Sequence, residues 1–115
     1  MAQIIDLNRR RRKRRQTVYF TREDLNRLLS MFSRQVIANE WLDYTIDAEE
    51  GYAVFCVYRR AHESPLYKIF RLAPEDSANG AYLIMDRKGK ASQTSDLQSA
   101  LLDLARPVKA VWPPR

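Results

Sequence analysis

Apolar residues at helical spacing mark the first regular element of the chain. Leucine, phenylalanine and valine recur every three or four positions over residues 25–36, which predicts a helix with a single apolar stripe. Thr21 is a good N-cap for this helix, and Asp24 stands three positions further on, close to a capping box. We expect the helix to end near Asn39, because asparagine tolerates the left-handed conformation that ends many helices.

Four strand patterns follow the first helix. Residues 42–47 alternate between apolar and polar side chains, as in a strand with one buried face. Residues 52–58 are apolar at every position, which is typical of a central strand. Residues 66–72 and 81–85 supply the third and fourth strands. The connections are short, so we expect consecutive strands to pair antiparallel in a meander.

A second helical pattern lies near the C-terminus. Leucines recur at helical spacing over residues 96–105, with Ser95 as the expected N-cap, Gln98 in the capping-box position and Pro107 as the expected stop. The elements together predict an α+β fold, a four-stranded antiparallel meander sheet flanked by an N-terminal and a C-terminal helix in the order α-β-β-β-β-α. Two arrangements stay open. The helices share one face and leave an apolar face bare, or each covers one face.

The positive charge of the chain is concentrated at its N-terminus. The 115 residues carry a net charge of +6, and residues 9–15 are seven consecutive cations. Residues 16–115 hold equal numbers of cations and anions, so the net charge comes from the N-terminal segment alone. Seven like charges repel one another and bury nothing. We therefore expect a disordered basic arm over residues 1–16, a single domain over 17–112 and a short tail over 113–115.

Three interpretations of the basic arm are open. The arm suits nucleic-acid phosphates, which is the interpretation we favour. It also suits an anionic membrane surface, or it serves solubility alone. The candidate anion-binding residues of the arm are Arg9, Arg10, Arg11, Arg12, Lys13, Arg14 and Arg15.

Several classes of chemistry lack the residues that they need. The one cysteine cannot form an intramolecular disulfide or a cysteine-rich zinc site. No apolar run approaches the roughly 20 residues of a transmembrane helix. The chain also lacks a nucleophile elbow, a glycine-rich phosphate loop and a metal-ligand spacing. We therefore expect a non-catalytic protein without cofactor or metal, and the lone thiol and missing secretory pattern favour the cytoplasm.

The loop between the second and third strands holds another candidate site. Arg59, Arg60 and Tyr67 lie close together in the sequence, and arginine forks bind phosphate or carboxylate groups, so these three residues are candidates for anion binding. The alternative is structural, with Arg59 or Arg60 paired to Glu63 so that the loop is fixed.

The tyrosines on the predicted strands are a third candidate. If they share an uncovered face of the sheet, they form an aromatic platform on which single-stranded bases stack. The alternative places them at the edge of the core with their hydroxyls in water. The missing glycine and phenylalanine spacing of RNA-recognition domains favours this alternative.

Part of the sequence resembles a known family. The most specific stretch is Arg59-Arg60-Ala61-His62-Glu63-Ser64-Pro65-Leu66-Tyr67, and residues 23–29, 40–47, 53–55 and 80–82 are similar too. These stretches resemble a small bacterial family catalogued as domain of unknown function number 2794. The resemblance covers about residues 18–105 and implies one intact domain. It supplies no activity, cofactor or catalytic residue.

Two functions fit these observations. The first is an accessory nucleic-acid-binding protein whose arm holds the phosphates, and a basic patch on the body near the root of the arm would favour it. The second is a protein-interaction or regulatory module that forms a homodimer through an apolar sheet face, and a large face left bare by the helices would favour it. The physiological partner and the oligomeric state stay open at this point.

Overall fold

The computed structural model describes residues 15–111 and, within the last helix, side chains through Ala105. The architecture is α+β with an antiparallel sheet and two long helices, as predicted, but the sheet has five strands and not four. In chain order the elements are α2 (Arg22–Ile37), β1 (Asp43–Glu49), β2 (Tyr52–Tyr58), β3 (Tyr67–Leu72), the 3-10 helix η1 (Pro74–Asp76), β4 (Tyr82–Asp86), β5 (Ala91–Thr94) and α3 (Leu97–Val111).

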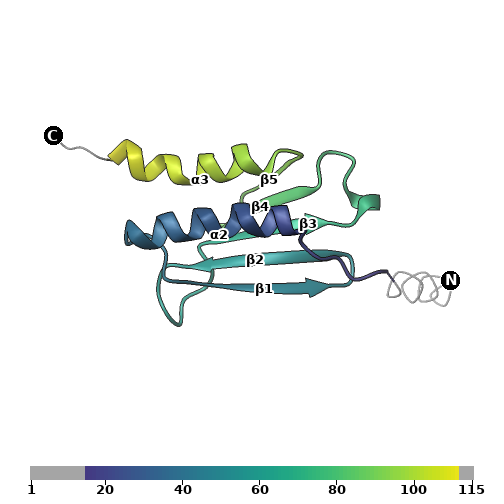
Figure 1. Cartoon of the computed structure of the whole chain (residues 1–115), viewed down its shortest axis with the longest axis horizontal. Coiled ribbons are helices and arrows are strands. Elements are labelled where there is room, and N and C mark those ends of the chain that lie inside the picture. The colour runs from purple at the N-terminus through teal and green to yellow at the C-terminus, as the bar shows by residue number, and fades with distance from the viewer. Residues whose placement is uncertain (1–14, 112–115) are drawn as a thin grey trace.

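The sheet is a meander covered on one face. Its strands lie in the order β1-β2-β3-β4-β5, and every neighbouring pair is antiparallel. Figure 1 shows α2 and α3 next to each other in front of the sheet. The structure therefore has the first of the two predicted arrangements, and no described element covers the opposite face.

The first helix begins where its capping residues predict. The N–H of Asp24 donates to the hydroxyl of Thr21, and the N–H of Thr21 donates to the carboxylate of Asp24, both at 3.0 Å. This reciprocal capping box satisfies two backbone donors that a helix start leaves unpaired. The helix ends at Ile37, and Asn39 adopts a φ of 64°. The predicted left-handed residue after the helix is therefore confirmed.

The fifth strand is the element that the sequence pattern missed. β5 reads Ala-Ser-Gln-Thr, so it has no apolar alternation to reveal it. Pairing with β4 holds it in place, and the side-chain amide of Gln93 donates to the carbonyl of Gly80 at 2.9 Å. The carboxylate of Asp86 accepts from the N–H groups of Lys88 and Lys90, which shapes the turn into this strand. A four-stranded sheet was wrong because backbone and turn contacts, and not burial, form β5.

The second helix differs from its prediction at both ends. Its cap is Asp96 and not Ser95, because the N–H of Ser99 donates to the Asp96 carboxylate at 3.1 Å. The helix also continues beyond Pro107 and ends at Val111. A proline inside a helix removes one backbone donor and crowds the preceding turn, which bends a helix but need not end it. The expected stop at Pro107 was therefore wrong.

The core lies between the helices and one face of the sheet. β2, β3 and β4 contribute Phe55, Val57, Ile69 and Ile84, and these residues pack against Leu28 and Met31 of α2 and Leu97 and Leu101 of α3. Trp41 is also buried, after the end of α2. Within residues 15–111, no helix has the length and apolar composition to span a membrane.

Candidate interaction surfaces

The alternation of side chains along β2 divides its apolar residues between the two faces of the sheet. Ala53, Phe55 and Val57 belong to the core under the helices. Successive side chains of a strand point to opposite faces, so Tyr52, Val54, Cys56 and Tyr58 point away from the helices. A strand that is apolar at every position therefore supplies apolar side chains to a face that no described helix covers.

The register extends this apolar surface across three strands. Val54 is paired with Phe70, and Phe70 with Leu83, so all three lie in one row. We call this surface the open face; its apolar residues are Tyr52, Val54, Cys56, Tyr58, Phe70, Leu72, Leu83 and Met85. The rings of Tyr52 and Phe70 meet edge to face with centroids 5.6 Å apart. Val54 and Cys56 on this face are 9% and 8% exposed.

The charges on the open face are mostly negative. The carboxylates of β1 lie along one side of the apolar surface and belong to Asp43, Asp47 and Glu49. Lys68 of β3 lies within the apolar surface. Such a surface repels a polyanion more than it attracts one. An aromatic platform for nucleic-acid bases on this face would lack the cations that usually accompany one.

The single cysteine lies at the centre of the open face. Burial is the largest influence on the Cys56 thiol and raises its pKa, while hydrogen bonding with Thr45 acts in the opposite direction. The thiol therefore stays protonated at neutral pH and acts as a small apolar group.

The tyrosines divide between the two faces of the sheet. Tyr44, Tyr67 and Tyr82 lie under the helices, where the ring of Tyr44 stacks on that of Phe55 at 5.2 Å. Only Tyr52 and Tyr58 lie on the open face, so the strand tyrosines do not form one platform.

Charged residues of the loop between β2 and β3 form ion pairs. Arg60 lies 3.9 Å from Glu63, as the structural alternative predicted, but Arg59 lies 3.7 Å from Glu40. A cation that the sequence did not suggest, Arg87 of the β4–β5 turn, lies 3.3 Å from Glu63. These partners are 24 residues apart in the chain, so only the sheet register reveals that the two loops meet.

Tyr67 packs against the core, whereas Arg59 and Arg60, the other two candidates for an anion site, are exposed and ion-paired. It points towards the helices and packs near Trp41, with ring centroids 6.4 Å apart. Burial raises the pKa of its hydroxyl, and the nearby charge of Asp86 adds to this effect. Of the three candidate residues, the two arginines are thus paired with carboxylates and the tyrosine packs in an aromatic contact.

The root of the basic arm lies among acidic residues. Arg15 is ion-paired with Glu75 at 3.2 Å and with Asp76, and its guanidinium lies against Gly51. The next residues pair with the β1–β2 turn, where Thr17 bridges Glu50. A basic patch here would have favoured nucleic-acid binding, but the described side chains paired with Arg15 are carboxylates. The remaining six cationic arm residues, Arg9 to Arg14, and the tail over 113–115 lie outside the described residues.

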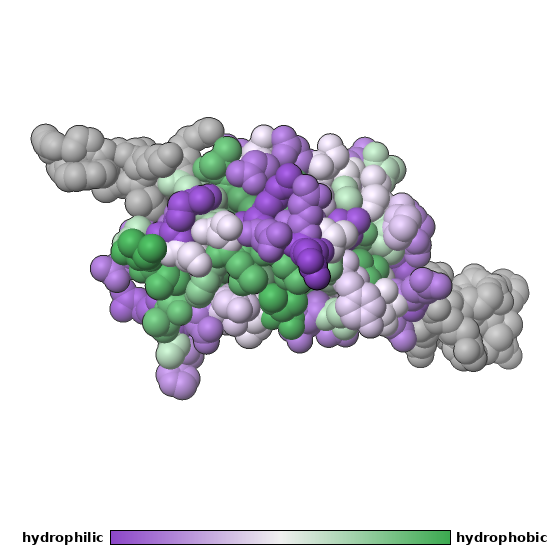
Figure 2. Space-filling model, in the orientation of Figure 1, coloured by the Kyte–Doolittle hydropathy of each residue, from purple (hydrophilic) through white to green (hydrophobic). Residues whose placement is uncertain are grey.

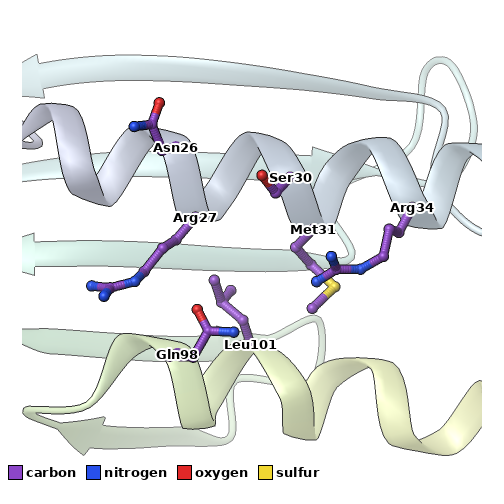
Figure 3. Close-up of a pocket in the computed structure, with 7 residues that line it drawn as sticks. All are labelled: Asn26, Arg27, Ser30, Met31, Arg34, Gln98 and Leu101. Atoms are coloured by element: carbon purple, nitrogen blue, oxygen red, sulfur yellow. The ribbon is translucent and has the colours of Figure 1, made fainter.

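A polar groove separates α2 from α3 on the covered side of the molecule. It has a volume of about 290 Å³, and Met31 and Leu101 form its apolar floor. Figure 3 shows Arg34 reaching over Met31 while Arg27 extends towards the other end of the groove. Arg27 is paired with Glu23 at 3.1 Å, one helical turn away. The groove is therefore basic and polar, in contrast to the acidic and apolar open face.

A buried carboxylate ties α2 to the sheet. Asp24 is 2% exposed and accepts hydrogen bonds from Arg71 of β3 at 2.7 Å and from the Tyr82 hydroxyl of β4 at 2.6 Å, besides the capping bond from Thr21. Burial alone would raise the pKa of Asp24, but the bonds from Tyr82 and Thr21 and the charge of Arg71 outweigh it, so the pKa is lowered. The sequence predicted the cap but not this tertiary contact. Every acceptor here is satisfied, so the cluster is a structural one.

The family model for the protein of unknown function DUF2794 matches residues 18–101, which is most of the chain. The chain belongs to the DUF2794 family. The match begins at Val18, just after the root of the basic arm, and it includes all five strands of the DUF2794 sheet. No curated protein and no solved structure matches the chain.

Proposed function

We propose that this DUF2794 protein is a non-catalytic interaction module that forms a homodimer through the open face of its sheet. One observation carries the proposal. Both helices lie on the same side of the sheet, and eight apolar side chains on the other side have no described element over them. Apolar patches larger than a few hundred Å² are uncommon on monomers and mark interaction sites.

The size of the open face suits a second copy of the same surface. Five strands spaced about 4.8 Å apart, each with four to seven residues of about 3.3 Å, give the whole sheet a flat area of roughly 460 Å². The accessible area of a pleated surface is larger, so two copies would bury on the order of 1,000 Å² or more, which is the lower limit for a specific interface. Two such sheets can pack about 10 Å apart, with their inner side chains forming a new core.

The chemistry of the open face favours protein over nucleic acid. Most of its central side chains are apolar and its carboxylates lie towards β1, which resembles the apolar core and polar rim of protein interfaces. Lys68 lies in the middle strand of this face, and a lysine is compatible with such an interface because its apolar stem can be buried while its ammonium stays in water. In a dimer with a two-fold axis, both partners use the same patch, so the open face alone is enough to form the interface.

A pair of matched lysine substitutions tests the proposal. Phe70→Lys places a charge in the centre of the open face, whereas Ile37→Lys also replaces an apolar residue by lysine, but at the end of α2, where the side chain is 82% exposed. A central interface residue costs about 2 kcal/mol or more, so Phe70→Lys should weaken the dimer at least roughly thirtyfold in sedimentation equilibrium. Ile37→Lys should leave the association unchanged. Equal effects of the two substitutions would exclude the open face as the interface.

A further inference from the structure

The first strand of the sheet has an edge without a partner. β1 is the outermost strand, and among the described residues only the segment around Thr17 pairs beside it, at the β1–β2 turn. The stretch 43–48 therefore has no described neighbour on its outer side. An unpaired edge offers a row of backbone donors and acceptors to another extended chain.

The hydrogen-bond pattern identifies which residues offer these groups. The N–H of Leu72 donates to the carbonyl of Ala81, so the backbone groups of Leu72 point towards β4. Backbone groups alternate in direction along each strand, and carrying this alternation through the register directs those of Ile46 and Ala48 to the outer edge. The backbone of Tyr44 fits this assignment, because its N–H donates to the side-chain carboxylate of Asp43 at 2.7 Å.

The two faces of this edge differ in chemistry. On the open face, β1 presents the carboxylates of Asp43, Asp47 and Glu49. On the helix side it presents Ile46, 40% exposed, with Leu42 just before the strand, 56% exposed. Figure 2 shows hydrophobic surface at the end of α2 and along β1 on this side. Side chains of an added strand would alternate between an acidic row and an apolar row.

We propose that the edge of β1 binds an extended segment of a partner protein in which basic and apolar residues alternate. The segment adds a sixth strand, pairs its backbone with Ile46 and Ala48, and places its cations beside Asp47 and Glu49. Its apolar side chains pack beside Ile46. A second copy of β1 does not fit this position, because its own carboxylates would lie next to those of the first. The backbone groups of this site lie on the outer edge of β1, and the site shares only the carboxylates of Asp47 and Glu49 with the rim of the open face.

Two blocked peptides of identical composition test this site on the full chain. In one peptide three arginines alternate with three valines, and in the other the arginines precede the valines. Amide resonances are followed during titration with each peptide. The alternating peptide should shift the Ile46 and Ala48 amides and bind about tenfold more tightly than the grouped peptide, a difference of about 1.4 kcal/mol. Equal affinities would overturn the proposal, since they would show unspecific attraction of cations.

Three variants separate the edge from the rest of the surface. Ala48→Pro removes one outward donor at a position where edge strands tolerate proline, and it should weaken the alternating peptide about tenfold. Asp47→Asn should weaken it and reduce its salt dependence, whereas Glu23→Gln, which neutralises an exposed carboxylate of α2, should change nothing. Full affinity in Ala48→Pro, or shifts confined to Tyr52 and Phe70, would refute binding at the edge. Binding only after removal of residues 1–14 would show instead that the chain's own segment fills it.

Discussion

Replacing Asp24 by asparagine tests whether one buried carboxylate holds α2 on the sheet. The wild-type carboxylate accepts bonds from Thr21, Arg71 and Tyr82. Asparagine has the shape of aspartate and keeps one acceptor oxygen. Its NH₂ group is a hydrogen-bond donor, however, so it would face the donors that the second carboxylate oxygen of Asp24 accepts from. A hydrogen bond to a charged group contributes about 1.5–3 kcal/mol. Since the Arg71 side chain keeps 28% of its exposure, water recovers part of the loss, and we expect a net cost of about 2–4 kcal/mol.

Thermal unfolding and acid titration measure this effect. For a domain of this size, about 2–4 kcal/mol corresponds to a melting temperature lower by about 10–25 °C. The pKa of Asp24 is lowered in the folded state, so its stabilisation is complete above the ordinary carboxyl pKa of about 4 and is lost as the pH falls below that value. The difference between wild type and Asp24→Asn should therefore shrink below about pH 4.

Two control variants make the result interpretable. Tyr82→Phe removes one bond to Asp24 and should cost about 1–2 kcal/mol. Glu23→Gln neutralises an exposed carboxylate in the same helical turn and should stay within about 0.5 kcal/mol of wild type. If Asp24→Asn unfolds within about 0.5 kcal/mol of wild type, or if the difference does not depend on pH, the contact does not carry the stability assigned to it.

Three further outcomes are expected. Gly80→Ala should cost more than about 2 kcal/mol, because φ is +124° and a Cβ would lie 2.2 Å from the carbonyl carbon of Thr94, whereas Gly89→Ala, with open space around it, should cost about 1 kcal/mol in urea unfolding. Phe55→Ala should cost about 3–5 kcal/mol by the same assay, since Phe55 is fully buried. If the basic arm binds nucleic acid, removal of residues 1–14 should abolish that binding and its salt slope of about −0.7 to −0.9 per phosphate, and unchanged affinity would show that the arm is not the binding element.

Sequence periodicity predicted the elements that bury apolar residues. The sequence correctly predicted the apolar stripe and capping box of α2 and the full length of β2. These features depend on the burial and the local hydrogen bonds of residues that are close together in the sequence. β5 was missed because its stability comes from pairing with β4 and from the Gln93 amide. Asp96 was missed as the α3 cap because Ser95 beside it is an equally good capping residue.

The candidate surfaces depended on arrangement more than on pattern. The all-apolar sequence of β2 indicates two apolar faces, but it does not say that both helices lie on the same one. The pairs from Glu63 to Arg87 and from Asp24 to Arg71 join residues far apart in the chain, so no local pattern predicts them. In contrast, the acidic residues at alternate positions of β1 were visible in the sequence. Only the structure shows that β1 lies at the edge of the sheet, where these residues could contact an added strand.

Sedimentation equilibrium of the wild-type chain across the micromolar range tests the central claim most directly. An open face of eight apolar side chains that pairs with itself predicts a mass of twice the 13.5 kDa chain, falling towards 13.5 kDa only on dilution. A constant mass of 13.5 kDa at every concentration would contradict the homodimer.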